Sequence, residues 1–387
     1  ETVVTAHCVA PLFLPWSPML FRAARLRLAA IAAVGIVAVV AGCTAPPTGA
    51  SSAPEVAGPR PPLAEIALLD NPRTDGAEAT ALIADAAITP ITEDPAQTLP
   101  VTVTSRDLDG DREVTVEATD RVLALDIAGS IAATTWALGF GDRLVGRDVL
   151  TTFPGTDELP LITSSGHAVS SEAILALRPE LIITDGTVGP TDVLVQLREA
   201  GITVVYVDVE PGLDAPAQLA RDVAAVFGAT EAGELLATAL DAELDAAVAE
   251  VAAIAPSAPD ERVRILFLYL RGASGVYYLF GEESGADELI EALGGVDVAG
   301  EIGWTGLRPM TDEALIAANP DLILVMSSGL ESVGGVDGLL AEKPAIALTE
   351  AGQNRRFVDL ADGEVLSFGP RTPLVIDALA RAIYGAD

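Results

Sequence analysis

The 387-residue sequence carries 56 acidic and 22 basic side chains, a formal net charge of −34, and half of its residues are hydrophobic. This acidity excludes the basic surface that nucleic acids require and argues against electrostatic attraction to an anionic membrane. The length is sufficient for two or three domains with sizeable cores.

The chain begins with segments that we interpret as processing signals. Residues 19–42 combine three arginines with an apolar run over 28–40, which fits a signal peptide and is short for a membrane span. Small residues precede Cys43 in "VAGC", a motif that resembles the lipobox of bacterial lipoproteins and implies cleavage before Cys43 and lipidation of its sulfur. A short transmembrane anchor is the alternative. Residues 1–18, which include His7, are interpreted as an over-extended start.

Residues 43–98 are predicted to be a lipidated, largely flexible tether, because small residues and proline dominate without a hydrophobic period. The folded part is expected to begin at Leu99. There, "PVTVTSRDLDGDREVTV" places alternating valines on both sides of a polar turn, which predicts a β-hairpin. The aspartates of this turn do not match the glycine and acidic positions of a calcium-binding loop.

Strand and helix patterns alternate after the hairpin. The runs "RVLAL", "DRLVGRD", "ELIIT" and "ITVVYV" are predicted strands, and amphipathic helices separate them. Residues 214–255 have a helical pattern, interrupted at "FGAT", that ends in one long helix. The alternation then resumes. We therefore predict an α/β fold with mostly parallel sheets covered by helices, with an N-terminal lobe over 99–213 and a C-terminal lobe over 256–387.

The two halves share a repeated segment. "SSEAILALRPELIIT" over 170–184 aligns without gaps with "TDEALIAANPDLILV" over 311–325, and Glu172 matches Glu313. Two Rossmann-like lobes joined by one long helix, on a lipoprotein, resemble the helix-linked class of substrate-binding proteins of ABC importers. The resemblance covers Leu99 to the C-terminus. It implies a metal chelate, such as a siderophore, cobalamin or haem, held in a cleft between the lobes.

The same resemblance implies a partner. In this class a glutamate on each lobe docks onto arginines of a permease dimer, which works with a separate ATPase, so Glu172 and Glu313 are the predicted docking residues. Each also stands in the first turn of a predicted helix, where a carboxylate complements the helix dipole without any partner. We expect the protein itself to be a monomer.

Apart from His7, the one histidine of the chain is His167, in the loop "SSGH" between a predicted strand and helix. Such loops line the ligand edge of an α/β sheet. In the second lobe, "RILFLYLRG" places Tyr269 and Arg271 on one face of a strand, near its C-terminal end. Imidazole and phenolate are suitable axial ligands of ferric haem, and Arg271 would orient the phenolate and stabilise its charge.

The motif "GH" before "SSEAILALRPELI", together with "YLRG", looks like the haem-binding subgroup from Gram-positive actinobacteria. In that subgroup the positions matching His167, Tyr269 and Arg271 are the axial histidine, the axial tyrosine and the arginine partner of the tyrosine. A polar surface histidine, a core tyrosine and an exposed arginine are the alternatives.

Three further positions are candidates for contact with the porphyrin. Met326 ends the predicted strand "DLILVM", and Tyr277 or its neighbour Tyr278 could stack on the macrocycle. Arg147 ends a predicted strand of the first lobe and could pair with a propionate. A core methionine and a surface salt bridge are the alternatives.

Together these patterns predict a lipid-anchored protein on the extracytoplasmic face of the cell membrane that captures haem b and hands it to an ABC permease. The sequence lacks a G-x-S-x-G elbow, a P-loop and a dinucleotide-binding glycine motif, so an enzyme is not expected. A siderophore- or cobalamin-binding protein of the same fold, and a surface haemoprotein with peroxidase-like activity, are the alternatives.

Overall fold

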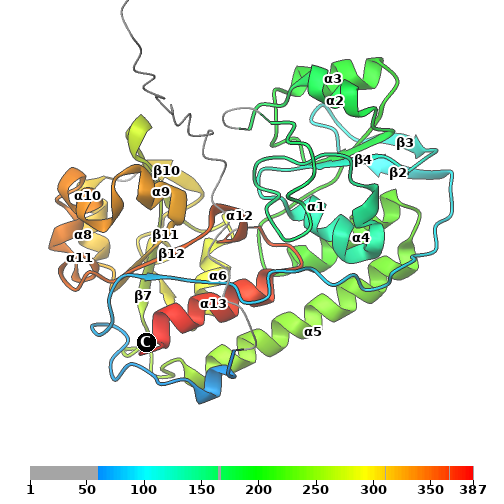
Figure 1. Ribbon diagram of the computed structural model, residues 1–387. Helices are drawn as coiled ribbons and strands as arrows, with labels where there is room; N and C mark the ends of the chain where they lie inside the picture. Colours follow the sequence, from blue (N-terminus) through cyan, green and yellow to red (C-terminus); the bar gives the residue numbers. More distant parts are fainter. Residues whose placement is uncertain (1–59, 164–166, 310, 366, 387) are drawn as a thin grey trace, which may run out of the picture. The chain divides into compact units, whose positions relative to one another are not determined.

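The structure, a computed structural model, describes residues 60–163, 167–309, 311–365 and 367–386 (Figure 1). The predicted signal peptide, Cys43 and His7 lie outside these residues. Within the described ranges, no helix has the length and apolar character that crossing a membrane requires.

The N-terminal lobe is built on a parallel sheet in the order β4-β5-β6 (Val122–Leu125, Leu181–Thr184 and Thr203–Tyr206). Every residue of β4 and β5 is buried, because a separate hydrophobic core packs against each face of the sheet. Strands covered on both faces are continuous apolar runs, which is why the sequence pattern identified them.

The predicted hairpin is present as β2 (Val101–Ser105) and β3 (Arg112–Val116). Its aspartates pair with arginines: Asp107 accepts from Arg112 at 2.8 Å and from Arg198 at 2.5 Å. The turn is therefore held by ion pairs, as its polar composition indicated.

The predicted strand "DRLVGRD" is wrong. A 3-10 turn η3 (Gly141–Arg143) is followed by single bridges, Leu144 with Val122 and Arg147 with Leu161. The preceding helix α1 (Ser130–Thr135) also ends early, in the wide turn η2 (Trp136–Phe140). Both differences from the prediction depend on contacts with segments distant in sequence, which a local hydrophobic pattern does not report.

The C-terminal lobe contains a larger mixed sheet in the order β1-β12-β11-β7-β8-β10, with β9 beside β7. β1, β12, β11 and β7 run parallel, and β8 and β10 are antiparallel additions at one side. The strand bounds are Ala79–Thr80 (β1), Arg264–Arg271 (β7), Val276–Phe280 (β8), Val296–Asp297 (β9), Leu307–Pro309 (β10), Leu322–Met326 (β11) and Phe357–Leu360 (β12). The fold class is the predicted one, α/β with mostly parallel sheets.

Helices cover both sheets. In the first lobe and the linker they are α2 (Ser171–Leu177), α3 (Thr191–Glu199), α4 (Ala215–Val226) and α5 (Thr230–Ile254). In the second lobe they are α6 (Ala286–Ala292), α7 (Val298–Glu301), α8 (Asp312–Ala318), α9 (Ser327–Ser332), α10 (Gly335–Glu342), α11 (Glu350–Gln353), α12 (Asp362–Val365) and α13 (Thr372–Tyr384). Short 3-10 turns complete it at η1 (Leu63–Glu65), η4 (Gly272–Ser274) and η5 (Ile346–Leu348).

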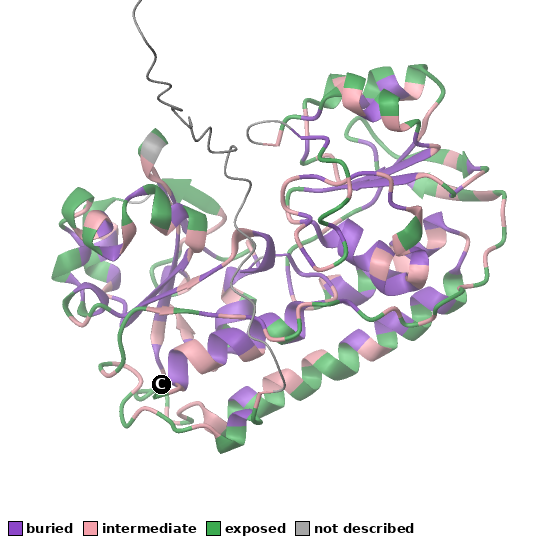
Figure 2. Cartoon of the chain, viewed as in Figure 1, coloured by how far each residue is buried: buried purple, intermediate pink, exposed green. Residues whose placement is uncertain are grey.

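The long helix α5 joins the two lobes. Its 25 residues span about 37 Å at 1.5 Å per residue. Leu236 and Leu240, in its first half, belong to the core of the N-terminal lobe, and Val251, near its end, belongs to the core of the C-terminal lobe. Figure 2 shows buried residues on the side of this helix that faces the lobes and exposed residues on its outer side.

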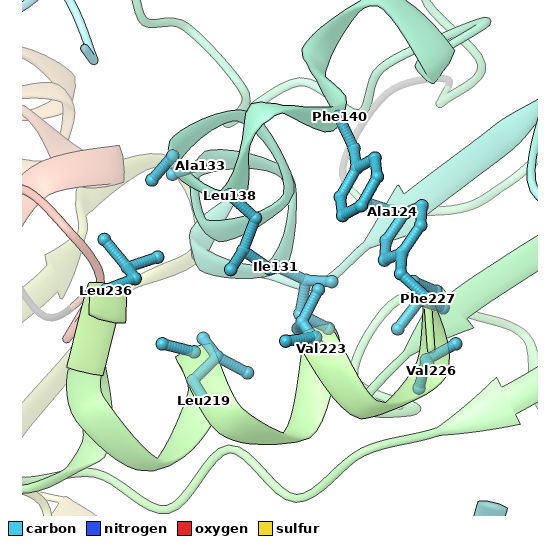
Figure 3. Packing of buried hydrophobic residues seen from close by; sticks show 14 of the residues in the cluster. Ala124, Ile131, Ala133, Leu138, Phe140, Leu219, Val223, Val226, Phe227 and Leu236 are labelled. Atoms are coloured by element: carbon cyan, nitrogen blue, oxygen red, sulfur yellow. The ribbon is translucent and has the colours of Figure 1, made fainter. Parts of the chain in front are cut away.

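The predicted interruption at "FGAT" separates α4 from α5. Gly228 there has φ +64°, and a Cβ on it would collide with the Thr98 carbonyl oxygen, so the chain crossing at this point requires glycine. Phe227 stacks on Phe140 with 4.1 Å between ring centroids, which anchors the turn in the core shown in Figure 3.

The prediction of a flexible tether up to residue 98 is wrong for residues 60–98. Leu63 is 1% exposed and lies in the C-terminal core, as do Ala81 and Ile83, whereas Ile88 lies in the N-terminal core. β1 in this segment pairs in parallel with β12. The segment thus contributes to both lobes.

The sequence concealed this order because the segment makes few and scattered apolar contacts. Its backbone is held by partners far along the chain: Leu69 N donates to Tyr384 O at 2.9 Å, and Arg356 donates to Pro72 O at 2.8 Å. Such contacts leave no helical or strand period in the segment itself.

We predict that Leu63→Ala lowers the free energy of unfolding by about 2–5 kcal/mol, because it leaves a cavity in a core that cannot fully collapse. Leu68→Ala is the matched control: its side chain is 43% exposed, so its effect should stay within about 0.5 kcal/mol. Urea unfolding measures both. Equal, negligible effects would restore the tether interpretation.

Candidate functional site

The repeated segment has one structure in both lobes. Ser170 caps α2 and Thr311 caps α8, each side chain accepting from a backbone N–H at 3.2 Å. Both helices have seven residues and end at a left-handed residue, Arg178 or Asn319, before the proline and the buried strand. The gapless sequence match is therefore a structural repeat.

Two arginines that the sequence alignment did not reveal extend the repeat. Arg121 donates to the Leu177 carbonyl at the end of α2, and Arg264 donates to the Asn319 and Ala318 carbonyls at the end of α8 at 2.7 and 3.0 Å. Each satisfies carbonyls that a helix end leaves unpaired. The two helices are thus fixed to their sheets in the same way.

The repeat presents two equivalent surfaces. Glu172 and Glu313 are both exposed in the first turns of α2 and α8. One turn further, Leu175 and Ile316 are 47% and 45% exposed, so each glutamate stands next to a large apolar side chain in solvent. The repeat therefore places the same pair, a carboxylate and a large apolar side chain, on the surface of each lobe.

In the C-terminal lobe, β7 directs Phe267 and Tyr269 to one face of the sheet. Tyr269 pairs with Tyr278 across β8, and its ring meets Phe280 edge-on at 5.9 Å. Because partners in register share a face, these aromatic side chains form one row that ends with Tyr269 at the end of the strand.

The guanidinium of Arg271 lies over the ring of Tyr269, 4.9 Å from its centroid. It donates to Asp362 Oδ2 and to Ser328 Oγ, both at 3.1 Å. Stacking and two hydrogen bonds together fix the charge of Arg271 beside the phenol. The sequence prediction that these two residues act together is consistent with this geometry.

His167 is half-buried, and its carbonyl accepts from Gly189 N at 3.3 Å. Burial lowers the pKa of its imidazole, the charge of Arg271 lowers it further, and Asp362 opposes them. Charges of the second lobe thus act on a histidine of the first. A lowered pKa keeps the imidazole neutral near pH 7, the form that binds metal.

Met326 and Tyr277 lie on opposite faces of the C-terminal sheet. Met326 packs with the core that contains Phe267, the face to which Tyr269 belongs. Tyr277 lies on the other face, where its hydroxyl donates to Glu342 at 2.5 Å and its ring receives Lys343 at 4.2 Å. Of the two adjacent tyrosines considered, the structure brings Tyr278, not Tyr277, to the side of Tyr269.

Arg147 is held within its own lobe. Its Nη1 donates to the Asp148 and Thr151 carbonyls at 3.3 and 3.4 Å, and its Nε is buried with no hydrogen-bond partner in the described part of the chain. None of these contacts connects it with Tyr269 or Arg271, so the structure does not bring it into that group.

Sequence reasoning missed Asp362 and Ser328. Each follows the end of a parallel strand, Ser328 after β11 and Asp362 after β12. Polar residues just beyond the carboxyl ends of such strands gather at one edge of the sheet. That rule, applied to "LVMSSG" and "DLADG", would have identified both.

A second acidic group lies at the same kind of edge in the N-terminal lobe. Asp126, directly after β4, accepts from Ser130 N and Ile131 N at 2.8 and 3.0 Å, and Asp148 lies near it. Burial raises the pKa of Asp126 to about 7, and the charges of Asp148 and Asp185 add to the effect.

A cavity of about 910 Å³ lies apart from these groups. Its walls come from β2, the chain after β6, and α4, and they include Arg106, Tyr206 and Asp222. None of His167, Tyr269 and Arg271 lines it.

We predict that stability conferred by protonated Asp126 is lost as pH rises from about 4 to 7. The folded state keeps a proton there that the unfolded chain has released, so the unfolding free energy falls through this window. Asp126→Asn removes this titration, and its stability relative to wild type should rise with pH by at most about 4 kcal/mol. Urea unfolding at several pH values, with the exposed Asp142→Asn as control, measures it; parallel curves would contradict it.

A family model of periplasmic binding proteins matches residues 127–363. Among curated relatives, a cobalamin-binding protein of Halobacterium salinarum is 26% identical over 265 residues, 68% of each chain. Among solved structures, the haem-binding protein HmuT is 38% identical, covers 81% of this chain and 99% of its own, and superposes with a TM-score of 0.75.

A second solved structure, the periplasmic haem-binding protein RhuT of Roseiflexus sp. RS-1, is 39% identical and covers 69% of this chain and 98% of its own, with a TM-score of 0.62. HmuT has also been solved with an arginine, a tyrosine or a histidine replaced by alanine. The two-lobed fold, its linking helix and these matches agree, and the chain belongs to the periplasmic binding protein family, whose members are extracytoplasmic substrate-binding proteins of transporters.

Proposed function

We propose that this protein captures ferric haem between its two lobes and delivers it to an ABC importer. The observation that carries the proposal is that one guanidinium serves both lobes: Arg271 stacks on Tyr269, and its charge acts on His167. Two donors suited to ferric iron, one from each lobe, are thus found around a shared positive charge.

The chemistry of the donors favours ferric haem. A neutral imidazole and an anionic phenolate are both protein ligands of haem iron, and the phenolate prefers the ferric state. Arg271 places a positive charge over the ring of Tyr269, 4.9 Å from its centroid. Two axial protein ligands also leave no open iron position, which suits a carrier more than a peroxidase.

The solved HmuT variants support the same three residues. In their numbering the substituted tyrosine and arginine are two positions apart, as Tyr269 and Arg271 are, and the histidine precedes the tyrosine by about a hundred residues, as His167 does. The matching spacing, at 38% identity over nearly all of HmuT, supports a haem site at these positions.

Cobalamin is the second candidate, because the Halobacterium relative is a cobalamin-binding protein. A corrinoid carries its own cobalt ligands and has no need of a phenolate. Binding of cyanocobalamin that is indifferent to Tyr269 would favour this candidate.

We predict that haemin titration gives a saturable ferric spectrum, and that His167→Ala and Tyr269→Ala each weaken binding by more than about tenfold, since each removes a donor to the iron. Optical titration of the described domain measures this. Tyr277→Phe is the control, because that phenol lies on the opposite face of the sheet, and its spectrum should match wild type.

If neither substitution changes the haemin spectrum, the haem proposal is wrong. Cobalamin, titrated in parallel, is then the ligand to test. Peroxidase turnover well above that of free haemin would favour an enzyme.

The permease is proposed to dock on Glu172 and Glu313. Support comes from the equivalent helices that carry them, with equivalent caps, arginine contacts and exposed apolar neighbours. A dimeric permease presents the same surface twice, which a repeated pair of surfaces can match.

We predict that reversing both charges, Glu172→Lys with Glu313→Lys, abolishes haem uptake by cells and leaves haemin affinity unchanged, because neither side chain is a proposed donor to the iron. Asp192→Lys with Glu350→Lys is the matched control: both are exposed acids in first turns, on α3 and α11. If the control pair loses uptake equally, the effect belongs to the helix dipole or net charge; if affinity falls, the docking assignment fails.

The lipid anchor at Cys43 is proposed from the lipobox-like "VAGC" alone. Lipidation there would hold the protein at the outer face of the membrane, in agreement with its extracytoplasmic family. Fractionation of cells that express Cys43→Ser tests it, and a variant that stays with the membrane would contradict it.

A further inference from the structure

Asp362 and Ser328 form a closed set of hydrogen bonds with Arg271. Asp362 Oδ2 accepts from Arg271 Nη2, Ser328 Oγ accepts from Arg271 Nη1, and Ser328 in turn donates to Asp362 through its hydroxyl and its N–H. Each member thus contacts the other two. An ion pair with this connectivity fixes the plane of the guanidinium as well as its position.

These hydrogen bonds matter because the Arg271 side chain could otherwise adopt other positions in solvent. Its side chain is 35% exposed, and a long cationic side chain at that exposure gains entropy by turning into solvent. Asp362 is only 14% exposed, and Ser328 lies in the first turn of α9. Hydrogen bonds to both partners therefore hold Arg271 over Tyr269.

The charge of Asp362 also compensates that of Arg271. The two side chains form an ion pair, with Arg271 Nη2 3.1 Å from Asp362 Oδ2. The pair thus places little net charge beside the Tyr269 phenol. Without Asp362, one positive charge would remain uncompensated beside it.

Asp362 is also one residue from the contact between the lobes. The next residue, Gly363, packs so closely that a Cβ on it would lie 2.9 Å from the Leu150 carbonyl oxygen of the N-terminal lobe. The residue that orients Arg271 is therefore itself positioned by the meeting of the two lobes.

We propose that Asp362 and Ser328 are positioning residues that hold Arg271 over the Tyr269 phenol, so that the iron–phenolate bond depends on them although neither touches the ligand. The inference rests on the proposed haem function. Asp362 orients the Arg271 guanidinium and compensates its charge, whereas Ser328 only orients it.

The test is haemin release from the loaded protein to an excess of a haem-scavenging protein, together with the midpoint potential of the bound haem. Asp362→Asn should release haemin about tenfold faster, the lower end of the effect expected when a metal ligand loses its partner, here Arg271. It should also raise the midpoint potential, because loss of a negative charge disfavours the ferric state. Ser328→Ala should speed release less and leave the potential nearly unchanged.

Asp359→Asn is the matched control. Asp359 is three residues away, and it also pairs with a serine, Ser327, but with no contact to Arg271. Its loss removes the same charge, and release and potential should stay at wild-type values. Urea midpoints confirm that each variant is folded. If Asp362→Asn does not fold, Ser328→Ala still tests the inference.

Release rates and potentials of Asp362→Asn that equal those of Asp359→Asn overturn the inference, and so does wild-type release from a folded Ser328→Ala. If wild type binds no haemin at all, the proposed function fails and the inference fails with it. If wild type binds haemin but Asp362→Asn changes neither release nor potential, the inference fails and the proposed haem function stands.

Discussion

The packing of α5 against both lobes is the constraint on which the site depends. The helix buries Leu236 in one core and Val251 in the other, so a single rigid rod fixes the distance between two separate sheets. The two proposed donors, His167 and Tyr269, belong to different lobes. Their relative position is therefore set in part by helix packing far from either residue, and the proposed pairing of a loop histidine with a strand tyrosine requires it.

Most of the fold was predictable because its elements have local periods. β5 and β11 are apolar runs that follow a capped helix and a proline, and the hairpin alternates around a polar turn. Residues 60–98 lack such a period, since their order comes from contacts with α5, α13 and β12. The turn over Trp136–Phe140 was missed for the same reason: at Gly139 the chain approaches the Thr92 carbonyl so closely that a Cβ would collide with it.

The site was predictable to the extent that residue type carries its chemistry. An isolated histidine and the pattern Tyr-x-Arg at a strand end are visible in a sequence, and Tyr269 and Arg271 do meet. Asp362 and Ser328 are common residue types at unremarkable positions, and they contact Arg271 only because three strands end at the same place. The choice between Tyr277 and Tyr278 could not be made from the sequence, because a one-residue step along a strand moves a side chain to the other face, and the structure brings Tyr278 to the face of Tyr269.

The order of residues in the two lobes has a consequence for how the chain folds. The cores of the N-terminal lobe use residues 88–240, one continuous stretch, whereas those of the C-terminal lobe use residues 63–83 together with 251–384. The N-terminal lobe can thus form as soon as its own residues are available. The C-terminal sheet is complete only when β1, a two-residue edge strand near the start, pairs with β12 near the end. Because pairing of segments so distant in sequence is slow, we expect the N-terminal half of the proposed site to form before its counterpart.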